Sequence, residues 1–411
     1  MRGRLALLRW LVLCTAAALV GTGCSNARQV RYESVDLERA TGEIASEELL
    51  DVGIMLFDPG LPEGEIDEKT LIFPDVRRAE ARYMPYHLRS TLETSGLWGS
   101  VWVLPDRSAS VDLLVWGRID QSNGLELKLQ AAAWDATGRE WLNKTYRTRV
   151  PEKAYSKYRD PGQDPYQNVY NQFANDLLAL RRSLGAKDLQ RIRETAELRF
   201  AADLAPSAYG DLVTKDDKGR YQLQRLPATD DPMMTRLRAV REREYSLIDT
   251  LNEYYAALYF DIGKPYEDWR KISRRETLKY EDLRRSAMWR YLLGAAAILA
   301  AVGYEGQQGS GANSGVTLAG IYGGIEAIKA GARKTAAAGD VREGIKEQGK
   351  SLEAEAEPLL VEIEGQTKRL TGTAEEKFRE WRRLLREIYE KESGLPALAP
   401  AAAPAPAPAP G

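Results

Sequence analysis

The chain has 411 residues, 44% of them hydrophobic, which is enough for two or three domains with apolar cores. A net charge of −2 at pH 7 argues against a nucleic-acid partner held by a general basic field. Because the chain contains one histidine, His87, and two cysteines, neither a histidine-based metal cluster nor a Ser-His-Asp triad is expected. We therefore predict no enzymatic activity, no metal and no cofactor.

The N-terminus is typical of an export signal. Arg2, Arg4 and Arg9 precede an apolar run from Leu11 to Val20, and three small residues separate that run from Cys24. This order resembles a bacterial lipoprotein signal, in which Cys24 would become the lipid-bearing first residue of the mature protein. Gly21 stands where that family usually has Leu, so a plain cleaved secretory signal stays open. The run is shorter than the ~20 apolar residues that a membrane span needs.

Under the lipoprotein interpretation, residues 1–23 are the signal peptide and residues 24–48 are a polar tether. Removing the signal also removes three arginines, so the net charge changes from −2 to −5. Ser25, and not Asp, follows the cysteine, and by the same resemblance this favours the periplasmic side of the outer membrane over the inner membrane. We expect the membrane to be one partner, through the lipid, and expect no nucleic acid.

Residues 49–205 are predicted to form an α+β domain, a mixed sheet with flanking helices. A short apolar run at Val52–Phe57 predicts a buried strand, and the spacing of apolar residues predicts a helix over residues 76–94. Four further strands are separated by turn-forming residues, at Val101–Leu104, Val111–Ile119, Leu125–Trp134 and Trp141–Val150. After Pro151 the apolar residues recur every three to four positions, the spacing of a helix. This spacing predicts helices over Tyr166–Leu184 and Leu189–Leu204.

The strands between Val111 and Val150 carry a family resemblance. One strand contains Gly117, and the next ends in Asp135, Thr137 and Gly138 of an Asp-x-Thr-Gly hairpin. This pattern resembles the periplasmic α/β domain shared by the TolB N-terminal domain, the curli secretion lipoprotein CsgG and the penicillin-binding-protein activator lipoproteins. The resemblance implies protein contact or assembly and no catalysed reaction. An unrelated fold with one helix layer on one sheet is the alternative.

The second half of the chain predicts a long-helical region. Residues 206–232 contain three prolines and a charged turn, and are interpreted as a linker. Residues 233–290 predict two helices, one marked by Leu237 to Leu258 and one that starts near Trp269 and continues into an apolar run. Residues 333–394 predict a charged, coiled-coil-like helix, and residues 395–411 a disordered Ala/Pro tail.

Residues 291–332 predict an apolar hairpin rich in small residues, similar to the glycine-zipper hairpins of bacterial envelope proteins. Small residues at every fourth position of a helix form a groove that lets another backbone approach closely. The glycines assigned to membrane or assembly contacts are Gly294, Gly311, Gly315, Gly320, Gly323, Gly324 and Gly331. A soluble helical hairpin packed by small residues is the alternative, because Glu326 and Lys329 each cost roughly 2.5–3.5 kcal/mol at a bilayer centre.

The tryptophans support a second functional hypothesis, an envelope-polymer binding site or active site in the first domain. It requires an open cleft with a carboxylate and several of Trp98, Trp102, Trp116, Trp134 and Trp141. Core packing is the other use of these rings. The first hypothesis is a non-enzymatic, lipid-anchored envelope protein that assembles with itself or with a periplasmic partner.

Overall fold

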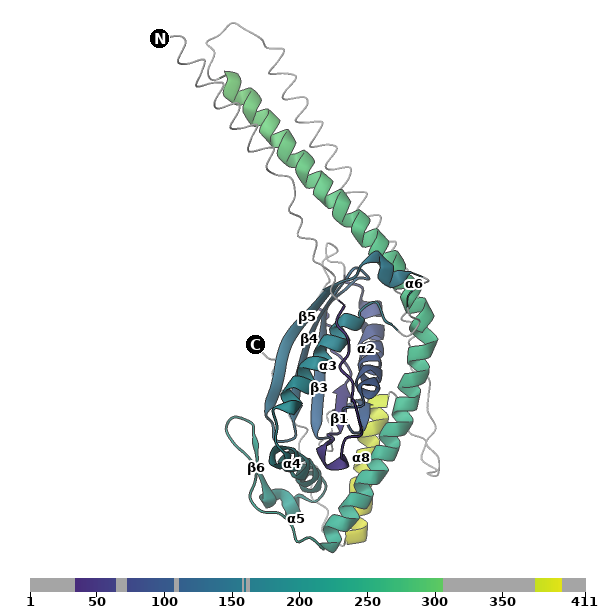
Figure 1. Cartoon of the computed structure of the whole chain (residues 1–411), viewed down its shortest axis with the longest axis vertical. Coiled ribbons are helices and arrows are strands. Elements are labelled where there is room, and N and C mark those ends of the chain that lie inside the picture. The colour runs from purple at the N-terminus through teal and green to yellow at the C-terminus, as the bar shows by residue number, and fades with distance from the viewer. Residues whose placement is uncertain are drawn as a thin grey trace, which may run out of the picture. The chain divides into compact units, whose positions relative to one another are not determined.

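The computed structural model describes residues 34–63, 72–106, 111–156, 159, 163–305 and 374–393. The secondary structure in these ranges lies in one compact unit, Val35–Gly411, and confirms the predicted α+β class (Figure 1). The five strands of the main sheet are β1 (Val52–Met55), β2 (Val101–Leu104), β3 (Leu113–Ser122), β4 (Glu126–Asp135) and β5 (Glu140–Arg149).

The sheet is mixed, with the strand order β2-β1-β3-β4-β5. β1 runs parallel to both β2 and β3, and the helix α2 (Pro74–Ser95) makes the crossover that parallel neighbours require. α2 ends at Gly96, whose φ of 65° places it in the left-handed conformation that commonly terminates helices. β3, β4 and β5 form an antiparallel meander, and buried and half-buried residues alternate along most of β3.

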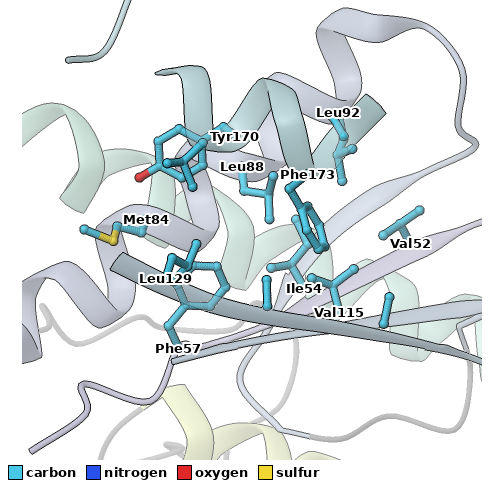
Figure 2. Packing of buried hydrophobic residues seen from close by; sticks show 14 of the residues in the cluster. Val52, Ile54, Phe57, Met84, Leu88, Leu92, Val115, Leu129, Tyr170 and Phe173 are labelled. Carbon is cyan, nitrogen blue, oxygen red and sulfur yellow. The ribbon is translucent and has the colours of Figure 1, made fainter. Parts of the chain in front are cut away.

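One face of the sheet is covered by α2 and by α3 (Gln167–Arg182). Figure 2 shows Leu88 of α2 and Phe173 of α3 packed over Ile54 of β1 and Val115 of β3. All four side chains are almost fully buried, and burying an aliphatic or aromatic side chain of this size contributes about 1.5–3 kcal/mol. α4 (Ala186–Leu204) follows α3, and the short 3-10 helices are η1 (Ser46–Glu48) and η2 (Glu152–Tyr155).

The described part of the expected tether lies against α3. Val35 N donates to Asn168 Oδ1 at 3.1 Å, and Asn171 Nδ2 donates to Val35 O at 2.6 Å. Asn175 repeats this arrangement three residues further along the tether, where Glu38 N donates to its Oδ1 at 3.0 Å. The chain therefore enters the domain along a row of asparagines on one helix.

The prediction of two helices between residues 233 and 290 is wrong. One helix, α6, runs from Pro232 to Glu305, and Pro265 lies inside it. Proline in a helix interior removes a hydrogen bond and costs about 3 kcal/mol. The neighbouring Ile262, Tyr266 and Trp269 are all buried in the main core cluster, so tertiary packing on both sides of the proline offsets the local cost.

The first half of α6 covers the open edge of the sheet at β2. The Asn252 amide accepts a hydrogen bond from Val103 N at 2.8 Å and donates one to Val103 O at 3.0 Å. Trp102 Nε1 donates to Asp249 Oδ1 at 2.8 Å. The Asn252 side chain thus makes the two hydrogen bonds that a neighbouring strand would make with Val103. This blocks edge-to-edge pairing with another strand at β2. α8 (Ala374–Ser393) packs beside α6, and its Phe378 is buried in a second cluster together with Trp102 of β2 and Leu251 of α6.

The segment expected as a linker contains regular structure. It holds α5 (Pro206–Tyr209), η3 (Gly210–Leu212) and a hairpin of β6 (Val213–Lys215) and β7 (Tyr221–Leu223). This hairpin touches the Asp-x-Thr-Gly turn, because Tyr221 N donates to Thr137 O at 2.7 Å. Gly138 in that turn has φ of 79°, and a Cβ there would come within 2.6 Å of Gly219 O.

Candidate functional site

A group of buried polar side chains lies where α6 crosses the α/β domain, and we call it the α6 junction. It joins α2, the end of β3, the start of α3 and the middle of α6. Its central members are Glu80, His87, Asp164, Tyr259, Tyr266 and Arg270.

A buried ion pair fixes α6 to the segment before α3. Arg270 NH1 lies 2.9 Å from Asp164 Oδ1 and 2.8 Å from Oδ2, and both side chains are 3% exposed. Asp164 Oδ1 also accepts the backbone N–H of Tyr166 at 2.8 Å. Burial alone would raise the pKa of Asp164, but the Arg270 guanidinium holds it below its usual value. Arg270 also lies over the Tyr266 ring, 4.1 Å from its centroid.

Glu80 on α2 is the second buried charge of the junction. Its Oε1 accepts hydrogen bonds from Tyr266 OH at 2.6 Å and from Ser122 Oγ at the end of β3. Arg77 Nε lies 3.8 Å from Glu80 Oε2. Burial raises the pKa of Glu80, and the nearby Arg77 opposes that rise only in part. A raised carboxyl pKa is one mark of a general acid, but this side chain is fully buried and holds three elements together.

His87 connects α2 to both α3 and α6. Its Nε2 is 2.8 Å from Gln167 Oε1, and its Nδ1 is 2.8 Å from Tyr259 OH. Gln167 Nε2 donates to Thr91 Oγ1 and to Asn171 Oδ1, which assigns its oxygen as the acceptor facing the imidazole. His87 therefore carries its proton on Nε2 and accepts at Nδ1. Burial lowers the pKa of His87, which favours this neutral form.

The β3–β4 turn meets the backbone of α6 directly. Gly124 has φ of 73°, and a Cβ there would come within 2.2 Å of Arg270 O. Its N–H donates to Tyr166 OH at 2.9 Å, and its carbonyl accepts from Tyr155 OH at 2.6 Å. Ser273 Oγ donates to Asn123 O at 2.9 Å. Glycine is needed at position 124 because helix and turn pack with no room for a side chain.

A surface groove of about 1190 Å³ lies beyond the junction, between η2 and the next turns of α6. Its lining contains Lys153, Lys271, Arg274, Arg275 and Lys279 against two acidic residues. Of the aromatic residues around the junction, Tyr155 lines it; none of the six central junction residues does. The chemistry of this groove is therefore that of a cationic surface and not of a buried acid-base site.

The positions of the five tryptophans in the described structure weaken the second hypothesis. Trp98, Trp102 and Trp141 are 7%, 6% and 9% exposed, and none of the five rings lines the groove. The Trp141 indole donates to Asp135 Oδ2 at 2.8 Å and so supports the Asp-x-Thr-Gly turn. Trp116 and Trp134 are half-buried on the sheet face that faces away from α2 and α3.

The residues predicted to contact the membrane fall mostly outside the described ranges. This holds for Cys24 and for the six glycines from Gly311 to Gly331, whereas Gly294 lies within α6. Among the described helices, none combines the length and apolarity needed to cross a membrane. Nor do three His, Cys, Asp or Glu side chains gather in the described ranges in a way that could hold a metal ion.

The α6 junction was missed by sequence reasoning. A signal was present, because Arg270 and Ser273 fall on the same helical face as Tyr266 and Trp269, where apolar residues are expected. A charged residue in such a stripe indicates a buried partner, but the sequence does not say which one.

Comparisons with protein families, with curated proteins and with solved structures give no match for this chain.

Proposed function

We propose that this chain is a non-enzymatic, lipid-anchored protein of the bacterial cell envelope, held on the periplasmic side of the outer membrane, that assembles with itself or with an envelope partner. The observation that carries the proposal is the continuity of α6. The helix is fixed at the junction and continues without a break into the small-residue segment that contains Gly294. Cys24 and the export signal before it supply the location.

The continuous helix couples the α/β domain to the apolar segment. Arg270 and Gly294 are 24 residues apart, which corresponds to about 36 Å along a helix. Because Arg270 is held by a buried carboxylate, the direction and rotation of α6 are fixed at the junction. Such a helix is suited to presenting a row of small residues to another helix at a defined angle.

The positions of the buried titratable side chains support a non-enzymatic role. The shifted pKa values of Glu80, His87 and Asp164 arise in side chains that hold helices together, and none of these side chains lines the groove. The resemblance of the sequence to the TolB and CsgG type of periplasmic domain is a further support for this proposal. The rival tryptophan site loses support because three of its five rings are buried.

The test is fractionation of cells that express the full chain with Cys24→Ala. We expect the precursor to stay uncut, or the protein to leave the membrane fraction. Cys14→Ala is the matched control, because Cys14 lies inside the apolar run and should change neither processing nor location. Unchanged processing and fractionation of Cys24→Ala would remove the lipid anchor from the proposal, and recovery of the wild type from the inner membrane alone would contradict the outer-membrane location.

A further inference from the structure

The groove between η2 and α6 has an excess of positive charge. Five basic side chains line it, against Glu152 and Asp282. Lys271, Arg275 and Lys279 follow each other at intervals of four residues, so they form one stripe along the helix. The side chains of Arg275 and Lys279 are 72% and 60% exposed.

The ion pairs within this stripe do not neutralise it. Lys271 Nζ lies 2.6 Å from Glu267 Oε1 and 3.9 Å from Asp268 Oδ1, while Arg275 and Lys279 share Glu276 at 3.4 and 3.7 Å. These are local pairs on one helix and partly exposed to water, where such contacts are weak and screened by salt. A stronger anion can therefore displace them.

Apolar side chains stand next to the charges on the same helix. Leu278 and Leu283 line the groove. Met288 and Trp289 follow, and they are 62% and 61% exposed. From Lys279 to Trp289 is ten residues, about 15 Å along the helix. An exposed tryptophan beside basic residues and an apolar run is the pattern found where a helix meets the headgroup region of a membrane.

We propose that this surface, the groove with Met288 and Trp289, docks on a lipid bilayer, with the basic stripe binding the anionic phosphate headgroups and the two exposed side chains entering the interface. The charge selects an anionic surface, and the exposed apolar pair selects a bilayer over a nucleic acid or an acidic protein. This inference rests on the proposed envelope location. It adds a second membrane contact to the lipid on Cys24, and this contact belongs to α6 itself.

The experiment uses the chain without residues 1–24, so that neither the apolar signal run nor a lipid on Cys24 can hold it on a membrane. The protein is sedimented with vesicles of phosphatidylcholine alone and with vesicles that also contain phosphatidylglycerol. We expect stronger binding to the anionic vesicles, weakened by added salt. Substituting Lys271→Glu, Arg275→Glu and Lys279→Glu together should weaken that binding by about a hundredfold or more, because each basic side chain at an anionic surface contributes roughly a factor of five and the three factors multiply.

Two variants control for the change in net charge and for the acidic groups that the Glu substitutions add. Reversal of the exposed Lys187, Arg191 and Arg225 changes the net charge equally but lies outside the groove, so most binding should remain. Lys271→Gln, Arg275→Gln and Lys279→Gln together remove the charge without adding acids and should weaken binding to a smaller extent.

A third variant, Met288→Ser with Trp289→Ser, tests the apolar pair. It should weaken binding while the urea midpoint stays that of the wild type, because both side chains are exposed.

Several results would overturn the inference. Equal binding to neutral and anionic vesicles would refute headgroup recognition, and equal loss in the groove and control reversals would refute the site. Binding of inorganic phosphate that the three groove substitutions abolish, without sedimentation of the wild type with either kind of vesicle, would mean that the groove holds a free phosphate and not a bilayer. Because the protein used here lacks Cys24, a failed lipidation test leaves this outcome unchanged, and the two failures can be told apart.

Discussion

Replacing Arg270 with Met should destabilise the protein more than any change to a surface ion pair. The substitution keeps most of the side-chain volume but leaves the Asp164 carboxylate, 3% exposed, without its cation. Removing one partner of a buried ion pair costs about 3–5 kcal/mol. Against a typical unfolding free energy of 5–15 kcal/mol, this is a large share of the total. Asp164→Asn combined with Arg270→Met should recover most of the loss, because a neutral buried pair leaves no uncompensated charge.

The measurement is urea unfolding followed by circular dichroism, with hydrogen exchange to locate the change. Protection should fall first in α6 around Tyr259 and Tyr266, which depend on the same junction. Arg182→Met is the matched control: Arg182 NH1 pairs with Glu38 Oε2 at 2.6 Å, but the side chains are 55% and 48% exposed, so the cost should stay below about 1 kcal/mol. If Arg270→Met costs no more than Arg182→Met, α6 is not held by the buried pair and the argument for coupling fails.

Three further predictions concern the turn, the histidine and the apolar hairpin. Gly138→Val should lower the unfolding free energy by about 1 kcal/mol or more, because a Cβ would be strained at φ of 79° and meet Gly219 O, and an unchanged melting temperature would contradict this. Burial lowers the pKa of His87 below 6.5, so the stability that it contributes above pH 6.5 should be lost as the pH falls through the lowered pKa; His87→Gln should make the unfolding free energy depend less on pH below pH 6.5. Replacing Gly315, Gly323 and Gly331 together by Leu should weaken oligomers in cross-linked envelopes and leave membrane association intact, and an unchanged oligomer size would make the glycines incidental.

The sheet was predictable because its signals are local. Short apolar runs closed by turn residues predicted all five strands to within a few residues, and β2 (Val101–Leu104) was predicted with its observed bounds. Gly96 ends α2 in the left-handed conformation, as its position beyond the predicted helix suggested. The Asp-x-Thr-Gly hairpin also follows from local chemistry: Asp135 Oδ1 accepts the Thr137 N–H at 2.9 Å.

The path of α6 was not predictable in the same way. Pro265 is a local reason to end a helix, and the reasons to continue it lie elsewhere, in the core cluster that buries Ile262 and Tyr266 and in the hydrogen bond from Tyr266 to Glu80 of α2. The junction shows the same limitation. Asp164 and Arg270 are separated by 106 residues, and a single sequence gives no means of pairing them. The residues that position the candidate site were therefore the hardest to predict from the sequence.

The chemistry of the junction gives a reason for its placement on a long helix. Apolar packing alone tolerates small shifts along a helix, since neighbouring turns present similar surfaces. A shift of one turn, 5.4 Å, would remove Arg270 from Asp164 and leave both charges buried without a partner. Glu80 and His87 impose the same condition through Tyr266 and Tyr259, which lie four and eleven residues before Arg270. We infer that the junction specifies the register of α6 as well as its stability, and the register in turn determines which way the basic groove and the segment beyond Trp289 face.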